Sequence, residues 1–201
     1  MDRGLKLAAL VVFASAVLLG GGCADDSSTR SVVTIVSINN NNPLESDVRN
    51  AGALPLDPSD DSIMDDVVEV TMANYPHDPA LDLRPGFPFG DVVFSSYKVT
   101  FIAENGNGNA PSGFTGTMHL LVPNAQPNPD EYVPPTAHIL LVPAGIKAEP
   151  PLSYLPDPIN SLLQINTEAR IEFYGRETVS DDLVTVTGSI MVSFADYVDE
   201  E

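Results

Sequence analysis

The sequence predicts an all-β protein folded as an antiparallel β-sandwich. About seven stretches carry apolar side chains at the two-residue period of strands, or as continuous β-branched runs. The connections between them are rich in proline and glycine, which account for 18 and 14 of the 201 residues. No stretch shows a convincing helical period. Short strands joined by turns, without helices between them, favour a sandwich, with a closed barrel as the second choice.

The first half of the domain is expected to hold two strands separated by a long loop. Val32–Ile38 is a β-branched run that ends at a cluster of asparagines and Pro43. The residues that follow are mostly proline, aspartate, glycine and alanine, which predicts a long loop over about 39–62. Val67–Met72 is the next strand, with Val68, Val70 and Met72 on one face.

A hairpin is expected in the middle of the chain. Asp91–Ala103 alternates as a half-buried strand, and Phe114–Val122 reads as its partner. The turn between them, Asn105–Asn109, alternates asparagine with glycine, residues that accept a positive φ. The residues expected to face the core are Val93, Tyr97, Val99 and Phe101 on the first strand and Met118, Leu120 and Val122 on the second.

The last third predicts one apolar strand and a second hairpin. Thr136–Pro143 is apolar on both faces, which suits a strand in the middle of a sheet. Prolines from 150 to 158 exclude a long helix and leave room for one helical turn at Ile159–Ile165. Thr167–Tyr174 and Leu183–Ala195 show the clearest alternation, and a polar loop joins them, so we expect them to pair antiparallel.

The strand number and the closing hairpin resemble immunoglobulin-like or fibronectin-type domains in general outline. The chain has no tryptophan and a single cysteine, so the buried tryptophan and the disulfide of antibody domains are missing. The resemblance therefore predicts an immunoglobulin-like architecture, and no function follows from it.

The first 23 residues, MDRGLKLAALVVFASAVLLGGGC, direct the chain to a compartment. Arg3 and Lys6 precede the apolar run Leu7–Leu19, which is shorter than the roughly 20 residues of a membrane-spanning helix. Three glycines then lead to Cys23. The segment resembles the signal peptide and lipobox of a bacterial lipoprotein. This resemblance implies removal of residues 1–22 and acylation of Cys23, where two or more chains give stable anchoring.

The same resemblance predicts the place of the domain in the cell. Ala24, rather than aspartate, follows the cysteine, which in lipoproteins implies sorting to the outer membrane, facing the periplasm or the cell surface. Residues 23–30 would form the lipidated N-terminus and a spacer reaching about 20–25 Å. Residues 31–201 would form a single domain. The alternative is an ordinary signal peptide followed by a buried structural cysteine.

The charge balance excludes some partners. The chain has a net charge of −19, and removal of residues 1–22 leaves seven basic and 27 acidic residues. The basic residues are scattered singly, whereas nucleic-acid binding needs clusters of them. We therefore expect no nucleic-acid partner and no direct binding to anionic lipid head groups.

No cofactor is expected, and calcium is the one candidate that the acidic residues leave open. Five aspartates lie in one predicted loop, but the helix-loop-helix calcium motif would need glycine at Ser62 and glutamate at Val68. A solvated acidic loop is therefore the default interpretation. Zinc or copper is not expected from His119, His138 and the loop residue His77 alone. The weak calcium candidates are Asp57, Asp60, Asp61, Asp65 and Asp66.

Binding is the function that remains by elimination. The sequence carries no nucleophile elbow, zinc-protease helix or phosphate-binding glycine loop, so we expect no enzyme. Aromatic and basic residues gather in a proline-rich loop and form the candidate partner surface: Tyr75, Arg84, Phe87 and Phe89. A second candidate contains Leu152, Tyr154 and Leu155, and in both cases the alternative is a cap over the open end of the sandwich.

These observations predict a non-enzymatic binding or structural subunit of a bacterial envelope or surface assembly. The lipid on Cys23 would hold it to the membrane, and its partner would be a protein of the envelope. The alternative is a calcium-stabilised adhesive or carbohydrate-binding module.

Overall fold

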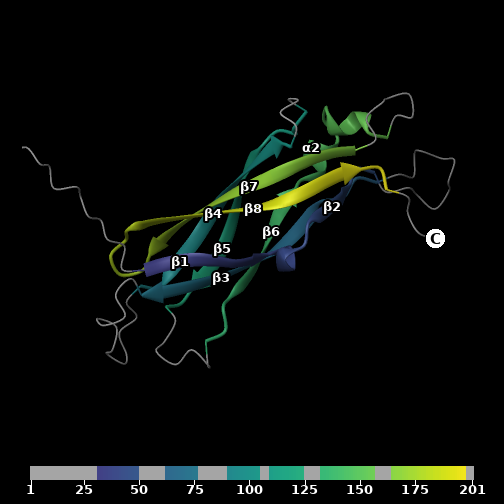
Figure 1. Cartoon of the computed structure of the whole chain (residues 1–201). Helices are drawn as coiled ribbons and strands as arrows, with labels where there is room; N and C mark the ends of the chain where they lie inside the picture. Colours follow the sequence, from purple (N-terminus) through teal and green to yellow (C-terminus); the bar gives the residue numbers. More distant parts are fainter. Residues whose placement is uncertain are drawn as a thin grey trace, which may run out of the picture.

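The computed structural model describes residues 31–49, 62–76, 90–104, 109–124, 132–156 and 164–197, which form eight strands in two sheets (Figure 1). The predicted all-β sandwich is confirmed. The three-stranded sheet has the order β1 (Ser31–Ile38), β3 (Asp66–Pro76), β6 (Thr136–Val142). The five-stranded sheet has the order β2 (Leu44–Asp47), β8 (Leu183–Ala195), β7 (Gln164–Glu177), β4 (Val92–Ala103), β5 (Phe114–Val122).

This strand order is immunoglobulin-like. In that fold, the first, second, fourth and fifth of seven strands form one sheet, and the third, sixth and seventh form the other. Here β1, β3 and β6 match the first, second and fifth strands, and β4, β7 and β8 match the third, sixth and seventh, while no described strand takes the place of the fourth. Strand β5 extends the second sheet beside β4, as an added strand does in variable-type domains.

The core lies between the two sheets and is built from the alternating apolar positions. The inward face predicted for β3 is confirmed, since Met72, for example, is fully buried. The alternation predicted for β7 and β8 buries one side of each strand, including Phe173 and Phe194. Strand β4 departs from its predicted alternation because Val92 and Phe94, rather than Val93, are buried. The pairing of β4 with β7 shifts register between Phe94 and Ser96, so a bulge reverses the alternation there.

The chain changes sheets directly after β1. The three residues of η1 (Asn39–Asn41) all have positive φ, and they lead to β2, which runs parallel to β8. The prediction of an uninterrupted loop over 39–62 was therefore wrong at Leu44–Asp47. The short sequence LESD has no clear alternation, and its strand conformation depends on the edge of β8.

Two further predictions in the last third need correction. Strand β6 lies at the edge of its sheet rather than in the middle. It is apolar on both faces because Leu141 and Val142 are both buried where β6 leads into the short helix α2 (Ala144–Lys147). The helical turn expected at Ile159–Ile165 is wrong at its end, since Ile165 belongs to β7, and residues 159–163 lie outside the described residues.

Tyr97 of β4 joins the two sheets through the core. Its ring packs against Phe114 and Phe173, with centroid distances of 6.1 and 6.2 Å. Its hydroxyl donates a hydrogen bond of 2.8 Å to the carbonyl of Leu140 in β6. The ring lies over Gly116 of β5, where an added Cβ atom would collide with its Cζ. The close fit requires glycine at 116.

We expect Gly116→Ala to lower the free energy of unfolding by about 1–3 kcal/mol, because the added methyl group collides with the buried Tyr97 ring. Gly145→Ala in α2 is the matched control, since nothing lies within 4 Å of its Cβ position. It should be neutral or stabilising by up to about 1 kcal/mol. Urea denaturation of both variants checks this, and equal effects would contradict the proposed packing.

Burial raises the pKa of Tyr97 above its ordinary value. Unfolded tyrosine ionises near pH 10, so above that pH the unfolded state binds fewer protons and the free energy of unfolding falls. Tyr97→Phe should cost about 1–2 kcal/mol near neutral pH, because the Leu140 carbonyl loses its donor. This difference from the wild type should narrow as the pH rises above 10. Denaturation curves at several pH values measure it, and a constant difference would contradict the prediction.

Candidate functional site

The lipidation site, the calcium candidates and the proline-rich loop surface comprise ten predicted residues, of which the structure describes three: Asp65, Asp66 and Tyr75. Asp66 begins β3 and Tyr75 lies near its end, so the strand separates the calcium candidates from the partner candidate. The structure therefore does not bring these two predicted sites together. The other seven lie outside the described residues: Cys23, Asp57, Asp60, Asp61, Arg84, Phe87 and Phe89.

The two described calcium candidates are engaged by protein groups. Asp65 Oδ1 accepts a hydrogen bond of 2.7 Å from the backbone N–H of Ala144, at the start of α2. Asp66 Oδ1 lies 3.0 Å from Lys147 Nζ, and its Oδ2 accepts from Ser46 Oγ at 2.5 Å. A carboxylate that already faces an ammonium group is a poor ligand for a second cation. These contacts favour structural roles for both aspartates.

Lys147 is the centre of this group, which we call the Lys147 cluster: Ser46, Asp47, Asp66 and Lys147. The lysine is only 2% exposed, and its ammonium donates to the backbone carbonyl of Asp47 at 2.7 Å as well as to Asp66. The cluster thus ties β2, β3 and α2 together at one end of the sandwich. Lys147 follows several apolar residues, and no pattern in the sequence indicates that its charge is buried.

Metal binding gains no further support from the geometry. Within the described ranges, no group of three or more histidine, cysteine, aspartate or glutamate side chains could hold an ion. His119 and His138 are exposed on β5 and β6, which belong to different sheets. His77 lies outside the described residues.

The two candidate partner surfaces differ in exposure. Tyr75 is 47% exposed and stands opposite Val32 of β1, which is 42% exposed. At the other candidate, Leu152 and Leu155 are buried in the core, whereas Tyr154 is exposed. The turn η2 (Leu152–Tyr154) therefore caps the sandwich, as the alternative interpretation predicted.

A second buried polar group lies at the end of the sandwich where β1 begins. We call it the N-terminal polar cluster: Ser31, Asn74, Gly90 and Glu177. Ser31 Oγ donates to the Gly90 carbonyl at 2.6 Å and lies 3.4 Å from Glu177 Oε1. The Asn74 side-chain amide donates to the same carbonyl. Gly90 has a φ of 92°, and a Cβ there would lie 2.6 Å from Ser31 Oγ, so glycine is required.

Glu177 is the one acidic residue of this cluster, and it is only 1% exposed. Its Oε2 accepts from Ser180 Oγ at 2.6 Å, and none of the ion pairs among the described residues includes it. The Oδ1 atom of Asn74 is buried and finds no partner in the described part of the chain. The cluster joins residues far apart in the sequence, so local patterns could not have predicted it.

Tyr132 extends this cluster along β3. Its hydroxyl accepts from the backbone N–H of Asn74 at 3.3 Å and donates to the carbonyl of Pro123 at 3.2 Å. Burial raises the pKa of Tyr132, which keeps the hydroxyl protonated and able to donate. These bonds hold the approach to β6 against the end of β3.

A groove of about 390 Å³ opens between β1 and β8. Its walls come from the second half of β1, the crossover to β2, and the residues Ser189–Met191 of β8. None of the residues that line it is charged. They are Ile35, Val36, Ser37, Ile38, Asn41, Asn42, Pro43, Ser189, Ile190 and Met191.

Comparison with protein-family models, with curated proteins and with solved structures found no match to this chain. Among the described residues, no helix is long and apolar enough to span a membrane.

We expect Lys147→Met to lower the free energy of unfolding by about 3 kcal/mol or more, because it leaves Asp66 and the Asp47 carbonyl without their shared donor. Lys98→Met is the matched control: Lys98 is half exposed, and its Nζ lies 3.9 Å from Glu172. Its loss should cost less than about 1 kcal/mol. Urea denaturation compares the two, and a small cost at Lys147 would contradict the importance of the buried pair.

Proposed function

We propose that this chain is an outer-membrane lipoprotein of a bacterial envelope, acting there as a non-enzymatic binding or structural subunit. The lipid would be carried by Cys23 after removal of residues 1–22. The partner would be a protein of the envelope, and nucleic acid is not among the expected partners.

The observation that carries the proposal is the place of Ser31. Only residues 24–30 separate it from Cys23, a distance of at most about 25 Å when fully extended. Ser31 is buried and hydrogen-bonded to Gly90, and β1 pairs with β3 along its length. The sandwich thus begins immediately after the spacer, and a lipid on Cys23 would hold the folded domain close to the bilayer.

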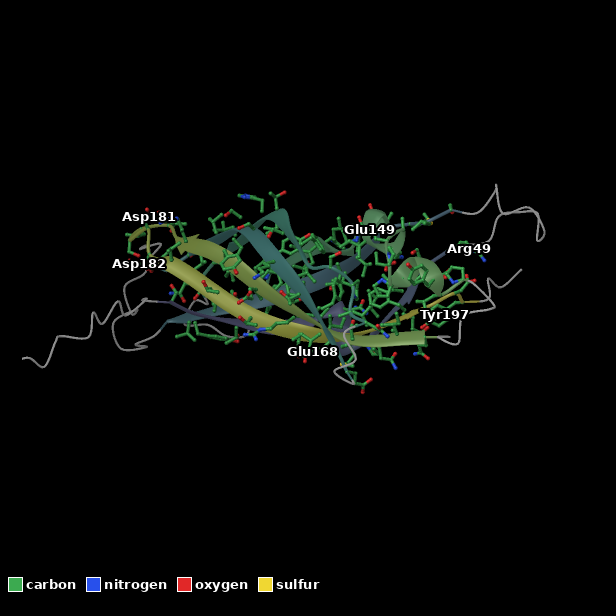
Figure 2. The ribbon with its side chains drawn as sticks, turned by 90° about the horizontal axis from the view of Figure 1, so that it is seen from above. Arg49, Glu149, Glu168, Asp181, Asp182 and Tyr197 are labelled. Atoms are coloured by element: carbon green, nitrogen blue, oxygen red, sulfur yellow. The ribbon has the colours of Figure 1, made fainter. Side chains whose placement is uncertain are left out.

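The position of β1 also orients the domain in this proposal. Ser31 stands at the same end of the sandwich as the turn between β7 and β8, which contains Asp181 and Asp182 (Figure 2). Arg49, Glu149 and Tyr197 lie at the opposite end (Figure 2). An anchor joined to Ser31 would leave that opposite end and the long sides of the sandwich available to partners.

The side chains support binding rather than catalysis. The buried polar groups at both ends serve the fold: Lys147 is paired with Asp66, and Glu177 is held by Ser180. By contrast, the exposed apolar side chains Val36, Met191 and Tyr75 offer contact surface. Exposed apolar and aromatic side chains are the usual anchors of protein–protein contacts.

We expect mass spectrometry of the mature protein to find an acylated Cys23 as its first residue. In detergent phase separation the wild type should enter the detergent phase, and Cys23→Ser should move to the aqueous phase because it has no thiol to acylate. Ser27→Ala, in the same spacer, is the control and should behave as the wild type. An unmodified cysteine, or cleavage at another residue, would overturn the proposal.

A further inference from the structure

We infer that β8 carries a docking site for an extended segment of a partner protein. The site consists of the open edge of β8 over Leu183–Ser189 and the groove beside it. The bound segment would add to the five-stranded sheet as a further strand. The segment would have an uncharged, alternating apolar centre and basic flanks. This inference rests on the proposed binding function and names the surface through which that function would operate.

The edge of β8 is only partly covered. On one side β8 pairs with β7 over its whole length, from Leu183 to Ala195. On the other side β2 covers only Val192–Ala195. No described strand pairs with residues 183–191 on that side.

The backbone groups on the open edge can be assigned from the pairing. The carbonyl of Ala195 accepts from the N–H of Val48 at 3.0 Å, so Ala195 presents its backbone groups toward β2. Alternate residues of a strand present their groups to the same side. Thr185, Thr187 and Ser189 therefore direct their N–H and C=O groups to the open edge, where an added strand could pair with them.

The groove lies where the side chains of such a strand would fall. It is lined by Ser189–Met191 on β8 and by Pro43, the residue before β2. A strand added along the open edge would therefore be in line with β2. Ile35, Ile38 and Ile190 line the groove, so it suits an apolar side chain of the added strand.

The other sheet edges are less suited to pairing. Strand β1 has a register shift between Ile35 and Ser37, and the pairing of β5 with β4 shifts between Phe94 and Ser96. Strand β6 has only seven residues, with prolines before and after it. Bulges, short strands and prolines are the devices by which proteins prevent edge pairing. Strand β8 has thirteen residues in unbroken register with β7 and contains neither proline nor charge.

The distribution of charge around the groove indicates what kind of partner segment would bind. The groove is uncharged, although the chain carries a net charge of −19. Acidic residues stand beyond both ends of the open edge, with Asp182 before β8 and Glu45 on β2. An uncharged centre therefore fits the groove, and basic flanks would meet these acids. A second copy of this chain fits less well, because both copies would carry the same large negative charge.

The test uses the intact protein purified in detergent and the synthetic peptide Lys-Val-Thr-Val-Thr-Val-Thr-Lys. A peptide of the same sequence, methylated on alternate backbone nitrogens, is the control that cannot complete a ladder of hydrogen bonds. Hydrogen–deuterium exchange should show protection of Thr185, Thr187 and Ser189 by the first peptide only. The amides of β5 and β6 should keep their exchange rates.

Variants of the groove provide the second readout. Val36→Asp places a carboxylate in the groove, and Met191→Asp does so from the β8 side; both residues are exposed, so the fold should tolerate the changes. Each should weaken peptide binding by at least about tenfold. Val32→Asp is the matched control on the same strand, since Val32 is similarly exposed but does not line the groove.

Three results would overturn the inference. The first is that millimolar peptide does not protect the three β8 amides from exchange. The second is that protection is confined to the amides of another sheet edge. The third is that Val32→Asp and Val36→Asp weaken peptide binding equally. Concentration-dependent self-association that protects the same three amides would assign the edge to a second copy instead. If Cys23 is acylated but the peptide does not bind, the docking site is contradicted and the lipoprotein proposal is still supported. If the peptide binds but Cys23 carries no lipid, the lipoprotein proposal is contradicted and the docking site is still supported.

Discussion

The structure depends on the crossover at Asn39–Asn41, which gives the N-terminal part of the chain one strand in each sheet. The three asparagines have φ values of 51°, 54° and 63°, a region that asparagine enters more readily than most residues. Because of this turn, β1 pairs with β3 while β2 pairs with β8. With a single cysteine the chain can form no internal disulfide, so this exchange and the core must hold the sheets together.

Buried polar groups complete the fold at both ends of the sandwich. Ser31 and Glu177 fix the start of β1 against the end of β7, and Lys147 fixes β2 against β3 and α2. Such groups cost free energy unless each finds a partner, so they favour one arrangement of the strands over others. Tyr97 has the same effect in the middle, where its hydroxyl can reach Leu140 only when the sheets are aligned.

The sequence predicted the features that depend on local alternation of apolar residues. It did not predict the features that depend on contacts with residues far along the chain. The inward faces of β3, β7 and β8 could be predicted because each strand buries one side along its length. Strand β2 could not, because its four residues are extended only beside β8. The burial of Lys147 and Glu177 also depends on partners far along the chain, at Asp66 and Ser31. Most of the calcium and proline-rich-loop candidates lie outside the described ranges, so only Asp65, Asp66 and Tyr75 among them could be placed.

The crossover that joins the sheets also accounts for the open edge. Because β1 must stay beside β3 as far as Ile38, the chain reaches β8 only at Leu44, opposite Val192, and the preceding part of β8 stays uncovered. Strand β8 begins at the Ser31 end of the sandwich, so this edge runs from that end toward β2 (Figure 1). On a lipid-anchored domain, a partner held at the same membrane would meet the edge at raised effective concentration, and modest affinity per strand would then suffice.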